Sequence, residues 1–279
     1  MSRAKTQVAR WGAPVTRALT MADNLAPPGV RVVNFHGVAP GDADAFESLV
    51  ESLGSRHGFA SPVDLLEPGG VRGRPVLLTF DDGVRSHSSV VAPVLDKLGV
   101  RAIFAVPSEF PSIPEHRQRV YAHEHQIQVE SEVEDERVAM TWDEVRSLGA
   151  NHTISCHTHT HHRFSPLDDL QVMCREVYES KDELERRLGH HVDTFTWVGG
   201  EEATYLPFAL NHVQLAGFRR TLATNHLITR RLTAEHSVIQ RSHVEATFGE
   251  ALARLQTGWA MDIRYLPKRR RIHRRLYRW

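Results

Sequence analysis

The sequence contains few cysteines and no long apolar segment. Its 279 residues include only Cys156 and Cys174, which could form one disulfide at most, so the fold does not depend on a disulfide framework. No run of about eighteen apolar residues is present, and residues 1–28 scatter lysine and arginine among short apolar stretches. We therefore predict neither a transmembrane helix nor a recognisable signal peptide. We therefore expect a cytoplasmic protein.

The chain also lacks net charge, because 34 lysine and arginine residues balance 34 aspartate and glutamate residues. No overall positive field attracts nucleic acid, so we do not expect nucleic acid as a partner. Two local blocks depart from this balance. Acidic residues gather at 130–136 and basic residues at 268–278, and each block is predicted to lie in solvent.

A fixed-period repeat and a second hydrophobic core are missing too. With 41% hydrophobic residues the chain can form one full-sized core, and we predict a single domain at residues 29–262. Residues 1–28 form an N-terminal extension and residues 263–279 a basic C-terminal tail. Residues 107–139, rich in Pro, His, Gln and Glu, are predicted to be an insertion or lid with little regular structure.

What the sequence does contain is a regular alternation of strand and helix patterns. Strand-like runs lie at 30–36, 76–80, 100–106, 153–156, 195–198, 218–223 and 238–240. Helical periodicity or end signals lie at 46–53, 90–98, 141–148, 165–188, 204–216 and 245–257. About seven strands alternating with helices predict an α/β fold with a largely parallel sheet, either open or closed into a barrel.

Chemically reactive residues follow two of these strands. Asp81, Asp82 and Gly83 come directly after the run at 76–80, and His157, His159, His161 and His162 come after the run at 153–156. In such folds the carboxyl ends of the strands are where sites are built. One carboxylate and two imidazoles could bind a divalent metal, and the second carboxylate could accept a proton.

Each segment also has a simpler interpretation. Asp-Asp-Gly is common in turns, and a polar run of histidines can be solvated. The two segments are more informative together, because they occupy equivalent strand ends and supply suitable ligand types. Cys156 precedes His157 on a strand and should face the opposite side, so we expect it to be a buried small residue rather than a ligand.

The segment Thr79-Phe80-Asp81-Asp82-Gly83, with His157-Thr158-x-x-His161, resembles the polysaccharide deacetylase family, the NodB-homology carbohydrate esterases. The resemblance extends from about His36 to roughly Trp259. It implies a distorted (β/α) barrel, Asp81 as the general base, and Asp82, His157 and His161 as metal ligands. A shift of one residue would make His162 the ligand instead of His161, but the family spaces its two histidines by four.

The implied activity is metal-dependent hydrolysis that removes an acetyl or similar small acyl group from an amino sugar of a polysaccharide, oligosaccharide or lipid-linked precursor. A Zn²⁺-class ion would polarise the amide carbonyl and lower the pKa of a bound water, while Asp81 accepts a proton. Mixed His and carboxylate ligands do not distinguish Zn²⁺ from Co²⁺, Ni²⁺ or Fe²⁺. Zn²⁺ is the expected cofactor and a carbohydrate the expected substrate.

Four further residues are candidates for the site. The segment Phe195–Gly200 lacks the arginine that the family uses to orient its base, and Arg241 is predicted to replace it. His243 is predicted to protonate the leaving amine, and Trp197 to stack on a sugar ring, although a core aromatic fits equally well. His36 ends the first strand and should face the site at the carboxyl ends of the strands, where it is predicted to bind substrate.

The altered segment also permits a different class of function, in which the fold is kept but the protein is a catalytically degenerate glycan-binding or scaffolding partner. The intact Asp81, Asp82, His157 and His161 favour the enzyme. The basic tail leaves three interpretations open: a solvated tail, contact with an anionic membrane surface, and contact with nucleic acid. We rank the membrane above nucleic acid, which would make the protein peripheral at the membrane.

Overall fold

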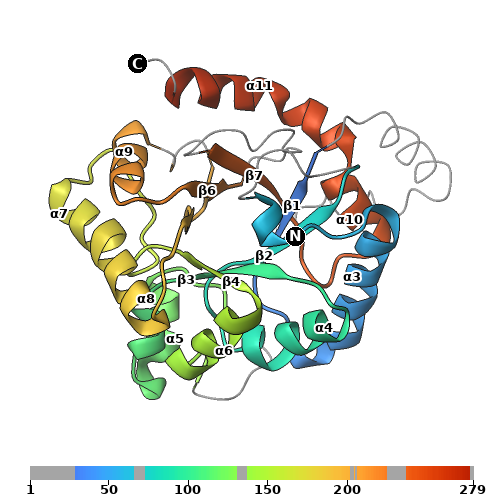
Figure 1. Ribbon diagram of the computed structural model, residues 1–279, viewed down its shortest axis with the longest axis horizontal. Coiled ribbons are helices and arrows are strands. Elements are labelled where there is room, and N and C mark those ends of the chain that lie inside the picture. The colour runs from blue at the N-terminus through green and yellow to red at the C-terminus, as the bar shows by residue number, and fades with distance from the viewer. Residues whose placement is uncertain are drawn as a thin grey trace.

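The protein is an α/β barrel in a computed structural model that describes residues 29–65, 73–130, 137–201, 204, 206–224 and 237–276. Seven parallel strands follow one another around the barrel in sequence order, and β7 pairs with β1 to close it (Figure 1). The strands are β1 Arg31–Phe35, β2 Val76–Phe80, β3 Ala102–Val106, β4 Thr153–Cys156, β5 Thr194–Thr196, β6 Arg220–Ala223 and β7 Ser237–His243. The predicted distorted barrel is confirmed. The distortion is greatest between β4 and β5, where a single residue pair is in register.

Helices surround the barrel (Figure 1). They are α3 Ala43–His57, α4 Ala92–Lys97, α5 Glu115–Glu124, α6 Trp142–Asn151, α7 Leu170–Met173, α8 Ser180–Leu188, α9 Pro207–Leu215, α10 Glu250–Thr257 and α11 Trp259–Leu276. Two π-helical segments, His87–Val91 and Cys174–Glu179, lead into α4 and α8, and short 3-10 turns lie at Pro40–Asp42, Pro62–Leu65 and Phe110–Ser112. Among these described helices, none is both long enough and apolar enough to cross a membrane.

Local end signals explain where several helices begin and end. Thr141 and Glu144 form the predicted capping box at the start of α6, and Gly189 ends α8 in the left-handed conformation at φ 76°. The predicted start at Ser165 is wrong. Ser165 instead bonds to Asp168 in a turn, and Asp169 caps α7 by accepting a hydrogen bond from the Val172 amide.

The barrel interior is apolar at one end and polar at the other. One cluster of buried residues draws on five strands and contains no helix residue, which places it inside the barrel: Val30, Val32, Ala60, Leu77, Ile103, Leu222 and Ile239. Because inward residues alternate along each strand, the next inward layer includes Asn34, Thr79 and Arg241. The apolar layer therefore fills the barrel nearer the amino ends of the strands. The polar layer lies nearer their carboxyl ends, where it forms the floor of a site.

Residues 107–139 contain more regular structure than predicted, since α5 occupies Glu115–Glu124. The helix buries only Gln118 and Ala122, so it has no apolar stripe for a periodicity analysis to detect. Gln118 holds it in place instead. Its side chain accepts hydrogen bonds from the amides of Val138 and Ala139 and donates one to the carbonyl of Ile113.

The last helix is attached to the barrel by a buried ion pair. Asp262 of α11 accepts two hydrogen bonds from Arg31 of β1, at 2.7 and 2.5 Å, and both side chains are almost fully buried. The predicted boundary between residues 262 and 263 therefore falls inside a helix. The predicted extension at residues 1–28 lies outside the described residues.

Buried His87 is expected to make the protein less stable in mild acid. The ring packs against Phe80 and Phe104, and burial lowers its pKa from 6.5 to about 4. Below pH 6.5 the unfolded chain takes up a proton that the folded chain resists, so stability falls as the pH drops toward 4, by about 3 kcal/mol at most. Urea denaturation at several pH values measures this loss. His87→Leu should flatten the dependence, and an unchanged slope in that variant would contradict it.

Candidate metal centre and catalytic pocket

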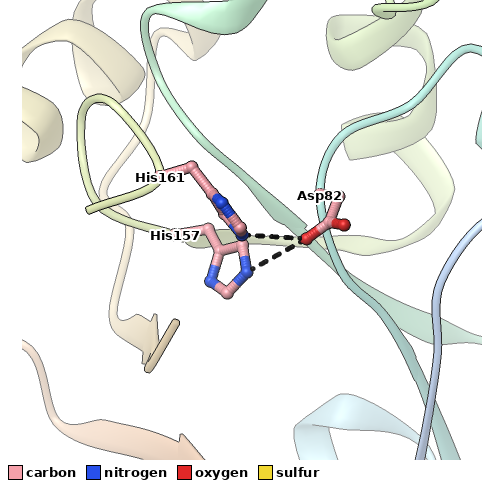
Figure 2. Close-up of side chains that lie close together, drawn as sticks. All are labelled: Asp82, His157 and His161. Atoms are coloured by element: carbon pink, nitrogen blue, oxygen red, sulfur yellow. Dashed lines mark ion pairs between the residues drawn. The ribbon is translucent and has the colours of Figure 1, made fainter. Parts of the chain in front are cut away.

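Two strand ends bring together three metal-ligating side chains. Asp82 follows β2, and His157 and His161 lie on the loop after β4 (Figure 2). The Oδ1 atom of Asp82 lies 3.1 Å from Nε2 of His161 and 3.5 Å from Nε2 of His157. All three ligand atoms lie within 4.8 Å of one another, and all three residues are buried. Within the described part of the chain, this is the one cluster of three such ligands.

Hydrogen bonds on the far side of each ligand suit the cluster to a cation. Nδ1 of His157 lies 2.8 Å from the carbonyl of Thr196, and Nδ1 of His161 lies 2.6 Å from the carbonyl of His125. A carbonyl can only accept, so each Nδ1 carries the proton and each Nε2 lone pair faces Asp82. Oδ2 of Asp82 accepts a hydrogen bond from the Gln128 amide at 2.8 Å, which leaves Oδ1 as a ligand. The Asp-His-His cluster can therefore hold a divalent metal.

Mutual attraction within the cluster shifts the pKa values of Asp82 and His161. Burial alone would raise the pKa of Asp82, but the neighbouring His161 and His157 hold it well below its usual range. Burial would lower the pKa of His161, but the Asp82 carboxylate outweighs burial and raises it. The cluster thus concentrates negative charge on Asp82, where a cation would bind.

The backbone is strained at the ligands. Asp82 has φ 86°, Thr158 has φ 63° and His161 has φ 61°, values that side chains with a Cβ rarely adopt. Each such residue costs of the order of 1–3 kcal/mol, and it persists only where surrounding contacts enforce it. Gly83, at φ 67°, completes the turn after Asp82 without this cost. Strain of this kind is typical of functional sites.

Asp81 forms a buried ion pair with Arg241 beside the metal ligands. Two parallel hydrogen bonds join them, Nη1 to Oδ1 at 2.6 Å and Nη2 to Oδ2 at 2.8 Å. Burial would raise the pKa of Asp81, but the Arg241 guanidinium outweighs burial and lowers it. Arg241 comes from β7 and also donates to Thr79 at 3.1 Å. The arginine absent from Phe195–Gly200 is thus supplied by another strand.

Asp81, Asp82, His157 and His161 line a pocket of about 610 Å³ at the carboxyl ends of the strands, and Arg241 lies buried behind Asp81. His36 and His243 form part of its wall, with ring centroids 5.2 Å apart. Trp197 does not line it. Its side chain is fully buried against Phe164 and Phe195, so the prediction that it stacks on a sugar is wrong, and it is a core aromatic. Its place at the end of β5 could not reveal which way the ring turns.

The remaining histidines and the cysteines have other roles. Nε2 of His162 pairs with Asp168 at 2.9 Å, and Nδ1 of His159 lies 2.7 Å from the hydroxyl of Ser108, so the alternative ligand His162 is not used. Cys156 is buried in the main core, where burial raises the pKa of its thiol to about 12. Both cysteines are free thiols.

Sequence reasoning missed the part that residues 124–128 take in the site. His125 and Gln128 bond to two of the ligands, and Glu124 and Gln126 line the pocket. The bonds to the ligands use backbone carbonyl and amide groups, which any residue type provides. Asn34 was also missed, although its position two residues before His36 on one strand indicates the same inward face.

Removing Arg241 is expected to destabilise the protein and to raise the pKa of Asp81. Arg241→Met would leave a buried carboxylate without its counter-charge, at a cost of about 3–5 kcal/mol in the free energy of unfolding. Chemical denaturation measures this loss. The control is Arg163→Met, since Arg163 pairs with Glu201 at the exposed rim and should change stability by about 1 kcal/mol or less. Equal effects of the two variants would contradict the assignment.

Comparison with known proteins agrees with this fold. A sequence profile described as polysaccharide deacetylase matches residues 69–220. No curated protein matches the chain. A solved structure of a de-N-acetylase from Aggregatibacter actinomycetemcomitans is 16% identical, with a TM-score of 0.63, and the alignment covers 81% of this chain and 99% of that one.

Two further structures are similar. The Streptococcus pyogenes deacetylase PplD in complex with acetate is 17% identical, with a TM-score of 0.63 and coverage of 83% of this chain and 99% of that one. IcaB from Ammonifex degensii is 19% identical, with a TM-score of 0.60 and coverage of 84% and 98%. At these identities the structures establish the shared fold.

Proposed function

The chain belongs to the polysaccharide deacetylase family, and from this premise we propose that it is a metal-dependent hydrolase that removes an N-acetyl or similarly small acyl group from an amino sugar. The observation that carries the proposal is the pairing of two functions in one pocket. Asp82, His157 and His161 can hold a cation, and Asp81 stands beside them with its own arginine. Acetyl is the simplest choice of acyl group, because one fold relative is described as a de-N-acetylase and another as a deacetylase with acetate.

The residues of the pocket divide the work of amide hydrolysis. A divalent cation, when bound, supplies Lewis acidity that polarises the amide carbonyl and lowers the pKa of a water. Asp81 accepts the proton of the attacking water. Arg241 fixes the orientation of that carboxylate and keeps it ionised, because its guanidinium lowers the pKa of Asp81.

The leaving amine needs a proton, and among the histidines that line the pocket His36 and His243 are the candidates to donate it. The sequence assigned this role to His243. Its ring nitrogens lie 3.4 Å from Nδ2 of Asn34 and 3.3 Å from a carboxylate oxygen of Glu245. His36 packs against this ring, with the two ring centroids 5.2 Å apart. We therefore keep proton donation with His243, because the Glu245 carboxylate beside it can accept a hydrogen bond from the protonated ring.

Single substitutions of the two histidines separate these assignments. His243→Ala should lower kcat by about 10²–10⁴-fold, the usual contribution of a general acid. His36→Ala should have a smaller effect, through the loss of packing against the His243 ring. Steady-state kinetics with an N-acetylated oligosaccharide measures both. A larger loss in the His36 variant would assign the role to His36 instead.

The whole proposal is tested by metal content together with acetate release. The purified protein is loaded with Zn²⁺, its metal content is measured, and acetate release from N-acetylated amino-sugar oligosaccharides is followed. Bound zinc with acetate release supports the enzyme. Bound zinc without release from any acylated substrate would support the alternative, a catalytically degenerate glycan-binding or scaffolding protein.

Contact of the basic C-terminal residues with an anionic membrane surface stays a prediction. Arg270 and Arg271 are exposed near the end of α11, while the side chains from residue 272 onward lie outside the described ones. The catalytic proposal does not depend on this contact.

A further inference from the structure

The loop after β4 holds both histidine ligands in a strained conformation. Thr158 and His161 have φ values of 63° and 61°, and His159 and Thr160 lie between them in the chain. Such strain is released when a loop can relax. Because His161 is itself one of the strained residues, relaxation would move its ring away from Asp82. Something must therefore hold this loop in the metal-binding conformation.

Glu176 makes the contacts that hold the loop. Its Oε2 atom accepts hydrogen bonds from the amides of His159 at 3.0 Å and Thr160 at 2.9 Å, and its Oε1 atom accepts one from the hydroxyl of Thr160 at 2.9 Å. The side chain is fully buried. Bonds to an ionised acceptor are roughly twice as strong as neutral ones, so one carboxylate ties down the centre of the loop.

The position of Glu176 explains how it reaches the loop. It lies in the π-helical segment Cys174–Glu179 between α7 and α8. A π-helical turn inserts an extra residue and redirects side chains, and such turns are frequent at functional sites. Arg175 donates to the same carboxylate at 2.8 Å from a half-exposed position, which offsets part of the cost of burying the charge. Glu176 itself does not contact the ligand atoms.

We propose that Glu176 is a positioning residue that holds the loop at residues 157–161 in its strained form and so sets the affinity of the site for a divalent cation. The proposal builds on the proposed function only in taking the Asp82, His157 and His161 cluster as the metal site. Losing an outer hydrogen-bonding partner of a metal ligand typically costs 10–100-fold in metal affinity. Glu176 acts on the backbone between the two ligands, so a similar loss is expected.

Titration of the metal-free protein with Zn²⁺ alone tests the proposal. Glu176→Gln keeps the shape of the side chain but removes the charge, and the dissociation constant for zinc should rise by about 10-fold; Glu176→Ala should raise it by about 100-fold. At saturating zinc the Gln variant should retain kcat within about threefold of the unmodified protein, because the occupied site has the same ligands.

Two controls separate positioning from general stability. Glu179→Gln alters an exposed glutamate of the same π-helical segment and should leave the zinc dissociation constant unchanged. Leu184→Ala opens a cavity in the core below and should lower the melting temperature without changing zinc affinity. The proposal is overturned if Glu176→Gln binds zinc within twofold of the unmodified protein, or if Leu184→Ala weakens zinc binding equally. Acetate release by the unmodified protein is measured separately. If the unmodified protein released no acetate, the proposed function would be overturned, but the zinc titrations would still test the role of Glu176.

Discussion

Asp81→Asn is expected to lose turnover by about 10²–10⁴-fold while zinc stays bound. An asparagine amide can still lie beside Arg241 and accept one of its hydrogen bonds, but it cannot accept a proton from water. The three metal ligands are untouched, since Asp81 is not one of them. The measurement combines kcat for acetate release with zinc content after dialysis.

The metal content in this experiment decides what the loss of turnover means. A variant that loses both zinc and activity would place Asp81 among the ligands and contradict the separation of roles between the two aspartates. A variant that keeps zinc and most of its activity would show that another group accepts the proton. Only retained zinc with lost turnover agrees with a general base held by Arg241.

His157→Ala is expected to lose the metal itself. His157 is one of three ligands, and its removal leaves a single imidazole and a carboxylate. The fall in zinc affinity should exceed the roughly 10–100-fold that loss of an outer hydrogen bond causes. Zinc titration of the metal-free variant measures this, and acetate release should disappear at zinc concentrations that saturate the unmodified protein.

A matched control lies two residues away on the same loop. His159 bonds to Ser108 rather than to the cluster, so His159→Ala should keep zinc bound with an affinity close to that of the unmodified protein. Comparable losses in the two variants would mean that the loop as a whole, and not the His157 ring, determines binding.

The fold was predictable because its signals are local and repeated. Each strand of the barrel contains a few apolar or β-branched residues in a short run, and the Thr141 capping box and Gly189 mark helix ends within a few residues. Closure of the barrel could not be predicted from such local signals. It depends on pairing between β1 and β7, which are about 200 residues apart, and the sequence left an open sheet equally possible until the family resemblance was considered. Helix α5 escaped prediction because a glutamine, not an apolar stripe, holds it.

The site was predictable to the extent that side chains at strand ends identify it. The three metal ligands, Asp82, His157 and His161, follow strands whose carboxyl ends lie at the same end of the barrel. Arg241 could be proposed because it lies near the end of another strand. Trp197 shows the limit of that argument, because position at a strand end does not fix whether a ring faces the pocket or the core. The backbone of residues 125 and 128 carries no residue-type signal at all, so its contacts required the structure.

Crystals soaked in Zn²⁺ and measured at the zinc absorption edge would test the central claim most directly, which is that Asp82, His157 and His161 share one cation. We predict one strong anomalous peak at about 2.0–2.2 Å from Oδ1 of Asp82 and from Nε2 of both histidines. A peak bound elsewhere, or no peak between these three side chains at saturating zinc, would contradict the account.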